Sequence, residues 1–297
     1  MQYDAIVIGG SFAGLAAATY LARARRSVCI LDTRSPRNRY AKASHGFLGQ
    51  DGTNPLAILD TARTQVLAYS TVVLIEREAI KARPVNSGFA VSLADGTIIE
   101  GQKLILAFGL RDILPAIPGI KERWGSTVLH CPYCHGIEFA NQPLGVLHSG
   151  TVSVHQALLI ADWGPTTLYL NGAKLDEKTE AKLVQRGVKM KDACVKAVAG
   201  ENGGLSTIIL RNGTRDAISA LYLTPQSVLS SSFADQLGIT IDHGPIGPTI
   251  RTDADRMTTV PGIYAAGDIA RVPHSVSWAV ADGVTAGTAA HRALVFR

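Results

Sequence analysis

Residues 3–14, YDAIVIGGSFAG, decide the fold. The apolar first half predicts a buried strand, and the alanine-rich segment from about Leu15 to Ala24 predicts a helix directly after the glycines. Gly9 permits a tight turn, Gly14 lets the helix pack close to the strand, and the free N–H groups at the helix start can hold a pyrophosphate. The stretch therefore predicts a dinucleotide-binding turn, with Ser11 in place of the middle glycine.

A second apolar strand, residues 27–31, ends at Asp32, which lies 18 residues after Gly14 (32 − 14 = 18). At a spacing of about 20 residues, an acidic side chain can bind a ribose hydroxyl. Because one glycine is missing, an ordinary strand–helix turn remains an alternative. The predicted nucleotide-binding set at this end of the chain is Gly9, Ser11, Phe12, Ala13, Gly14 and Asp32.

Residues 130–136, HCPYCHG, contain two of the four cysteines, flanked by histidines. A thiolate is the reactive form of cysteine, and a nearby protonated histidine or helix start lowers its pKa from about 8.5 to between roughly 3.5 and 7.5. The pair therefore predicts a redox-active dithiol. The same spacing also fits half a zinc site, a glutaredoxin-like motif or, with His135, a haem-attachment motif.

The other two cysteines argue against a metal site. Structural zinc needs four ligands, whereas Cys29 lies in an apolar strand and Cys194 stands alone in the middle of the chain. Both are expected to be buried structural thiols. Haem attachment normally requires export, and the chain enters its first strand without a leader pattern. We therefore expect no metal and a cytoplasmic location.

Composition favours a globular protein of two domains, with 297 residues, 46% hydrophobic and 18% charged. The net charge of +5 is modest, and the basic clusters at 23–26 and 34–39 are interpreted as solvated surface, so no nucleic-acid partner is expected. No run of 18 apolar residues occurs, so no membrane span is expected.

Near the C-terminus, residues 258–268, TTVPGIYAAGD, form an apolar strand pattern closed by Gly267 and Asp268, and a helix pattern runs from Ser275 to Ala293. With LILAFG at 104–109 and IPG at 117–119, these segments resemble the flavoprotein disulfide reductases, particularly their small thioredoxin reductase-like branch. The resemblance spans nearly the whole chain.

That resemblance implies FAD as cofactor. Asp268 would hydrogen-bond the ribityl chain, and the helix starting near Ser275 would direct its positive end at the flavin pyrimidine. Phe108 stands where the family has a threonine, so that contact differs. The FAD-binding residues predicted in this half of the site are Gly109, Gly267, Asp268, His274 and Ser275.

The implied fold class is α/β, with two Rossmann-like domains of three ββα/α layers. Residues 1–112 and 243–297 would form the FAD domain, and residues 113–242 an inserted domain carrying the cysteine pair. Proline and glycine near 115–119 and 244–248 mark the crossings. An Ala-Asp-Gly turn predicts a hairpin at 89–99. Within the middle region, strands are predicted at 144–147, 167–170 and 207–211, and helices at 154–162 and 176–186.

The middle region departs from thioredoxin reductases. They carry there a second glycine turn for NADPH and an arginine cluster for its 2′-phosphate, whereas this chain has HSGTVS at 148–153 and no arginine in LYLNGAK at 168–174. A β-carbon at His148 obstructs close phosphate approach, and no planar cation remains for bidentate phosphate binding. We predict a degenerate NADPH site; nicotinamide binding through other residues is the alternative.

The subgroup most resembled is the FAD-dependent dithiol oxidases of gliotoxin and holomycin type, which pass electrons from a small dithiol to O2. The likeness rests on SHGFLGQDG at 44–52, on His135 in place of an aspartate, and on His274-Ser275 in place of Arg-Gln. It implies Cys131 as the outer cysteine that exchanges with substrate and Cys134 as the inner one facing the flavin. His135 is the first candidate base and His130 the second. For His45 and His274, structural roles are equally open.

The resulting prediction is a dithiol oxidase that produces H2O2, acts on a small-molecule dithiol or a thioredoxin-like protein, and forms a homodimer. A thioredoxin reductase dependent on NADPH or ferredoxin is the first alternative. A flavin-binding redox sensor without turnover is the second.

Overall fold

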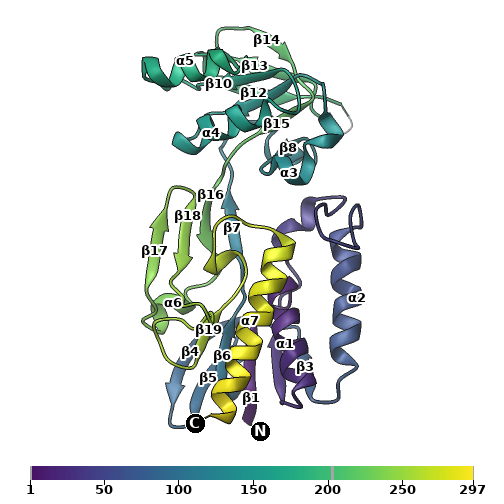
Figure 1. Ribbon diagram of the computed structural model, residues 1–297, viewed down its shortest axis with the longest axis vertical. Coiled ribbons are helices and arrows are strands. Elements are labelled where there is room, and N and C mark those ends of the chain that lie inside the picture. The colour runs from purple at the N-terminus through teal and green to yellow at the C-terminus, as the bar shows by residue number, and fades with distance from the viewer. Residues whose placement is uncertain (1, 202–203, 297) are drawn as a thin grey trace.

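The protein is described by a computed structural model covering residues 2–201 and 204–296, which has two lobes (Figure 1). The first and last described residues lie in the lower lobe of that view, and the middle of the chain forms the upper lobe. Two antiparallel strands, β7 (Leu110–Ile113) and β16 (Gln226–Leu229), connect the lobes. The predicted α/β class with an inserted second unit is confirmed.

The described residues of the lower lobe form a seven-stranded sheet. Its central strand β1 pairs in parallel with β2 and β6, so Ile8 lies opposite both Leu31 and Leu106. The predicted hairpin forms between β5 and β6. The strands, in sheet order with β19 pairing β6, are β3 (Val72–Ile75), β2 (Val28–Leu31), β1 (Gln2–Ile8), β6 (Ile98–Leu106), β5 (Gly88–Leu93), β4 (Ala79–Val85) and β19 (Ile263–Ala265).

Helices α1 (Phe12–Arg23) and α7 (Val276–Val295) lie side by side on one face of this sheet, with α2 (Pro55–Leu67) beside α1 (Figure 1). Helix α1 begins three residues before the predicted start, because Ser11 occupies the N-cap position and the helix starts inside the glycine turn. The apolar faces of these helices pack on alternate residues of β1 and β2. The layer holds the start of α1 at the carboxyl edge of the sheet.

The predicted second crossing at 243 lies inside β17 (Ile241–Gly244), which forms a hairpin with β18 (Gly247–Ile250). Phe233 of α6 (Phe233–Gln236) is fully buried in the apolar core of the lower lobe. The chain therefore returns to this lobe at β16. Glycine and proline at 244–248 serve a hairpin turn, which has the same composition as a linker.

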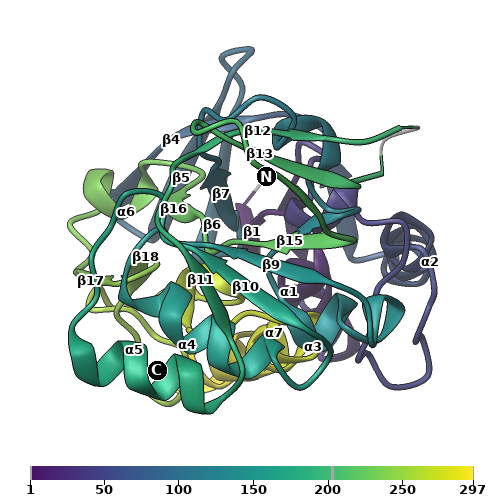
Figure 2. The ribbon, with the colours of Figure 1, turned by 90° about the horizontal axis from the view of Figure 1, so that it is seen from above.

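The upper lobe has a five-stranded parallel sheet within the described residues. Its helices lie on one face and a small antiparallel sheet on the other, each with its own apolar core (Figure 2). The parallel strands are β11 (Lys189–Lys191), β10 (Thr166–Tyr169), β9 (Leu144–Leu147), β15 (Ala220–Tyr222) and β8 (Val128–Leu129). The covering elements are α4 (Thr151–Ile160), α5 (Glu177–Gln185), β12 (Val195–Ala199), β13 (Thr207–Leu210) and β14 (Arg215–Ala217).

The two isolated cysteines differ. Cys29 is fully buried in β2, and burial raises its pKa to about 12, so the predicted burial is confirmed. Cys194 is only half-buried, and the prediction of burial was wrong there. It lies directly before β12.

Across the described residues, none of the helices combines the length and apolar character needed to cross a membrane.

Candidate functional site

A cavity of about 400 Å³ runs from the start of α1 to the cysteine pair and is lined by both lobes. Its size lies in the usual range of ligand sites. Gly14 is the one predicted residue that does not line it. The predicted residues that do are Gly9, Ser11, Phe12, Ala13, Asp32, Gly109, His130, Cys131, Cys134, His135, Gly267, Asp268, His274 and Ser275.

The glycine turn brings backbone against backbone. Gly9 has φ +105°, and a β-carbon there would lie 2.2 Å from the carbonyl oxygen of Ala107. A β-carbon on Gly14 would lie 1.8 Å from the carbonyl oxygen of Gly9. Ser11 makes no side-chain cap to α1. The first N–H groups of the helix are therefore available to an anionic group in the cavity.

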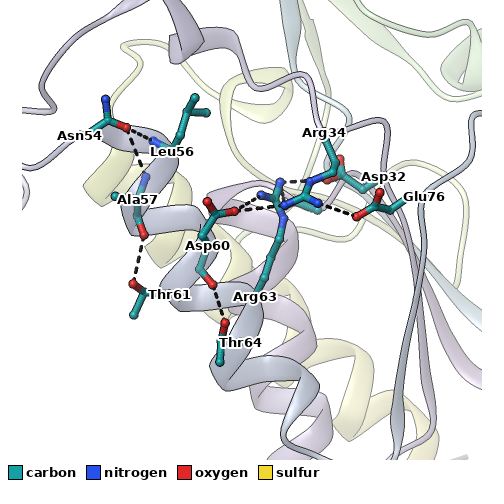
Figure 3. Close-up of polar contacts among 11 residues, drawn as sticks. Asp32, Arg34, Asn54, Leu56, Ala57, Asp60, Thr61, Arg63, Thr64 and Glu76 are labelled. Atoms are coloured by element: carbon teal, nitrogen blue, oxygen red, sulfur yellow. Dashed lines mark hydrogen bonds and ion pairs between the residues drawn. The ribbon is translucent and has the colours of Figure 1, made fainter.

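Asp32 is held by a partner that the sequence did not indicate. Arg63 of α2 donates from Nη2 to Asp32 Oδ2 at 3.1 Å, and both side chains are 9% exposed (Figure 3). Arg63 also pairs with Asp60, which contacts Arg34. The buried guanidinium keeps the Asp32 carboxylate in one orientation at the cavity wall. Nothing in the spacing from residue 32 to 63 reveals this contact.

Arg37, in η1 (Arg37–Tyr40), lines the cavity. Its Nε donates to Asp112 Oδ2 at 2.9 Å, and its Nη1 donates to Asp268 Oδ2 at 2.8 Å. Burial opposes ionisation of Asp112, but the hydrogen bonds and charge of Arg37 outweigh it and lower the pKa of that carboxyl. The interpretation of cluster 34–39 as solvated surface was therefore wrong for Arg37. Asp112 was not predicted from the sequence as a site residue.

His274 completes this cluster. Nη1 of Arg37 lies 2.8 Å from His274 Nδ1, and because arginine only donates, Nδ1 accepts. The proton of the neutral ring is then on Nε2. Burial lowers the pKa of His274, which favours this neutral form. Nε2 is itself buried without a hydrogen-bond partner among the described residues.

The cysteine pair lies at the far end of the cavity. Cys131 is the N-cap of the short helix α3 (Pro132–His135), and its Sγ lies 2.7 Å from Sγ of Cys134. The thiol of Cys134 donates to Cys131 and, against the effect of burial, helps to lower the pKa of Cys131 to about 7, with backbone N–H groups of the helix. The same hydrogen bond and burial raise the pKa of Cys134. The thiolate of the reduced pair is therefore on Cys131.

The two candidate bases face different surroundings. Burial, followed by the charge of Arg37, lowers the pKa of His130 to about 4, so this ring is neutral above that pH. Burial also lowers the pKa of His135. The charge of Glu138 raises this pKa, and the charge of His45 lowers it further. His135 packs edge-on against His45, with ring centroids 5.7 Å apart. The lowered pKa favours the neutral form of both rings, and it makes His130 a weak base at neutral pH.

The polar groups that line the cavity can be compared with the groups that FAD would present to them. The uncapped start of α1 suits a pyrophosphate, and Asp32 is an acceptor fixed at the expected position after β2. The unpartnered Nε2–H of His274 needs an acceptor, which a bound cofactor can supply. Ser275 caps α7 by accepting from Trp278 N at 3.1 Å, and Phe108 lines the wall without offering a hydroxyl. The residues present fit the cofactor.

Comparison with known proteins agrees with this site. Residues 3–283 match the family described as pyridine nucleotide-disulphide oxidoreductase. The curated thioredoxin reductase tcpT of Claviceps purpurea is 32% identical over 98% of this chain and 94% of its own length. An oxidoreductase structure from Agrobacterium tumefaciens has a TM-score of 0.96 and 41% identity, covering 100% of this chain and 99% of its own.

The structure of HlmI is also similar, with a TM-score of 0.93 and 35% identity over 99% of this chain and 93% of its own. These likenesses extend through both lobes. The chain belongs to the pyridine nucleotide-disulphide oxidoreductase family, as a thioredoxin reductase-like flavoprotein enzyme with FAD as its cofactor.

Proposed function

We propose that this flavoprotein oxidises a dithiol to a disulfide, with O2 as electron acceptor and H2O2 as product, and that it lacks a normal NADPH site. The observation that carries the proposal is the turn between β9 and α4, where a nicotinamide cofactor would place its phosphates. Ser149 N donates there to Ser153 Oγ at 2.9 Å, and Ser149 Oγ donates to the carbonyl oxygen of Thr224 at 3.0 Å. The side-chain hydroxyls of Ser149 and Ser153 are therefore engaged in hydrogen bonds within the protein.

The loop after β10 supports the same conclusion. Asn171 Oδ1 accepts from Val195 N at 3.0 Å, so this amide serves the loop itself. From His148 to Leu175 the sequence has no arginine and one lysine, Lys174. A 2′-phosphate is best bound by the planar fork of arginine. The start of α4, like that of α1, has no side-chain cap, but neither loop offers an arginine for the 2′-phosphate.

The chemistry of dithiol oxidation follows from the cysteine pair. In the disulfide form, a substrate thiolate attacks Cys131 Sγ, which forms a mixed disulfide and releases Cys134 as a thiolate. His135 accepts the proton of the second substrate thiol. That sulfur then attacks the substrate sulfur in the mixed disulfide and releases Cys131 as a thiolate, which its low pKa favours. The substrate leaves as a disulfide, and the enzyme holds two electrons in its dithiol.

When bound, FAD supplies the two-electron centre that couples this dithiol to O2. One dithiol and one O2 then give one disulfide and one H2O2. Tyr133 lies between the two cysteines in the chain and Ile137 follows α3, and both side chains are 73% exposed. Exposed apolar surface close to the cysteines in sequence suits an apolar small dithiol, and a thioredoxin-like protein is the second partner to test.

Anaerobic stopped-flow measurement of flavin absorbance tests the proposal. Dithiothreitol should reduce the flavin within the time of one turnover, whereas NADPH should reduce it no faster than buffer. Admission of O2 should restore the absorbance and release one H2O2 per dithiol. Cys131→Ser should abolish the dithiol reaction, and Cys194→Ser, a cysteine outside the cavity, should leave it intact.

Flavin reduction by NADPH at the rate of turnover would instead establish an NADPH-dependent thioredoxin reductase. Reduction only by reduced ferredoxin would identify the ferredoxin-dependent alternative. A disulfide that cycles with dithiothreitol without H2O2 release would identify a redox sensor.

A further inference from the structure

Three potential metal ligands from the two lobes meet beside the cysteine pair. His45 comes from the loop before α2 in the lower lobe. His135 ends α3, and Glu138 lies in η3 (Ile137–Phe139), both in the upper lobe. One donor atom from each of the three lies within 4.8 Å of the other two. The argument against zinc from the sequence concerned only the cysteines, and this cluster contains no cysteine.

The contacts of His45 orient it as a ligand. Its Nε2 lies 3.1 Å from Glu138 Oε1, and its Nδ1 lies 3.6 Å from Asp51 Oδ1. Asp51 Oδ1 is in turn fixed by Gly46 N at 2.8 Å. Both ring nitrogens of His45 therefore face a carboxylate. If Nε2 and Glu138 share an ion, Nδ1–H faces Asp51, which is the usual outer support of a metal-binding histidine.

We propose that His45, His135 and Glu138 bind one Zn²⁺ ion. Two histidines and a glutamate are an established zinc donor set, which leaves the fourth position to water or substrate. With zinc–ligand bonds of about 2.0 to 2.2 Å, ligands on one ion lie about 3 to 3.5 Å apart. A pair at the 4.8 Å limit must therefore approach by roughly 1.3 to 1.8 Å. Glu138 is 36% exposed and Asp51 is 71% exposed, so a hydrated ion can reach the site.

The ion would inhibit the enzyme. A zinc-bound His135 has no free lone pair to accept the proton of a substrate thiol, and the ion links the lobes through His45. This consequence rests on the proposed function, whereas binding of the ion does not. Removal of zinc by a chelator should restore turnover, because no covalent bond forms.

Binding is tested by isothermal titration of ZnSO4 into the FAD-loaded protein with its disulfide closed, so that thiolates cannot compete. We expect one Zn²⁺ per chain. Glu138→Gln should weaken binding more than tenfold, and Asp51→Asn should weaken it by about tenfold to a hundredfold. Glu122→Gln, an exposed glutamate in the same lobe, is the matched control and should leave binding unchanged.

Absence of binding in the disulfide form, or equal affinity in Glu138→Gln, would overturn the site. Zinc that binds only the reduced protein, and is lost in Cys131→Ser/Cys134→Ser, would assign it to the dithiol and also overturn the proposal. If zinc binds as expected but dithiols never reduce the flavin, the site stands and the oxidase function fails. Half-inhibition, relative to each variant's own zinc-free activity, should require at least tenfold more zinc in Glu138→Gln.

Discussion

Cys131 and Cys134 differ in what surrounds their thiols, although only two residues separate them. Cys131 receives the thiol hydrogen bond and the N–H groups of α3, so it carries the negative charge of the reduced pair. A sulfur with a low pKa is a good leaving group in disulfide exchange. The low pKa favours release of Cys131 in the second exchange step, whereas the raised pKa of Cys134 disfavours its release in the first, so the assignment of Cys131 as the exchanging cysteine stays a prediction.

Alkylation of the reduced protein by iodoacetamide should show this asymmetry. The rate at Cys131 should rise with pH around a midpoint of about 7. In Cys134→Ala the midpoint should move upward, because the largest cause of the lowered pKa is lost. Mass spectrometry of the labelled peptide measures both, with Cys194→Ser as control, and an unmoved midpoint in Cys134→Ala would contradict the assignment.

Asp32 combines a predicted role with a contact that the structure adds. Asp32→Ala removes a charged acceptor worth about 1.5 to 3 kcal/mol, so FAD affinity should fall by roughly tenfold to a hundredfold. It also leaves the buried Arg63 with only the exposed Asp60 as a charged partner, which destabilises the fold. Fluorescence titration of the apoprotein with FAD measures the affinity.

Asp32→Ala/Arg63→Met separates the two effects. The double variant should regain thermal stability, because no buried charge is left unpaired. FAD affinity should stay low, because the ribose acceptor is still missing. Recovery of affinity together with stability would show that Asp32 acts only as the partner of Arg63.

At the scale of elements, the β1–α1 turn sets the position of the cofactor site. Its apolar strand, glycines and helix form a local unit. Residue 14 must be glycine, because a β-carbon there would clash with the carbonyl oxygen of Gly9. By contrast, η1 has no such local signature. Arg37 is placed in the cavity by the elements around it, since its partners lie at positions 112 and 268.

Gly14→Val should therefore open the turn, displace the start of α1 and give a protein purified with little flavin. Tyr20→Val places the same β-branched residue at an exposed position of α1, where Tyr20 is 44% exposed, and should retain the flavin. The ratio of flavin to protein absorbance compares the two. A full flavin content in Gly14→Val would show that α1 does not need this close contact.

At the scale of the molecule, His130 couples the two lobes electrostatically. It belongs to the upper lobe, yet the charge of Arg37 in the lower lobe is one cause of its low pKa. The folded pKa of about 4 lies below the ordinary value of 6.5. Between these values the unfolded chain binds more protons than the folded protein, so stability falls as pH falls from about 6.5 to about 4.

The thermal midpoint of the wild type should accordingly fall between pH 7 and pH 4, and His130→Asn should lose less over the same range. At about 1.4 kcal/mol per pKa unit, the difference between the two proteins reaches up to about 3 kcal/mol. Calorimetry at several pH values tests this. Parallel pH profiles for the two proteins would exclude His130 as the source.

The homodimer and the cytoplasmic location stay predictions.

The sequence by itself determined the local units of this protein. The glycine turn, the hairpin at 89–99, the helix after Ser275 and the CxxC dithiol each depend on residues close in the chain, where backbone sterics and short-range hydrogen bonds act. Strand and helix periods likewise predicted the two α/β units. The second crossing was misplaced, because a hairpin turn and a linker share the same glycine and proline composition.

Only the tertiary structure decided how these units combine into a site. Arg37 meets Asp268 across 231 residues, and Arg63 meets Asp32 across 31. His45 reaches Glu138 from the opposite lobe. Such contacts have no sequence period, because they depend on where the packed helices, sheets and crossing strands bring the ends of distant elements. Burial at those meeting points then determines which charges pair and which pKa values shift.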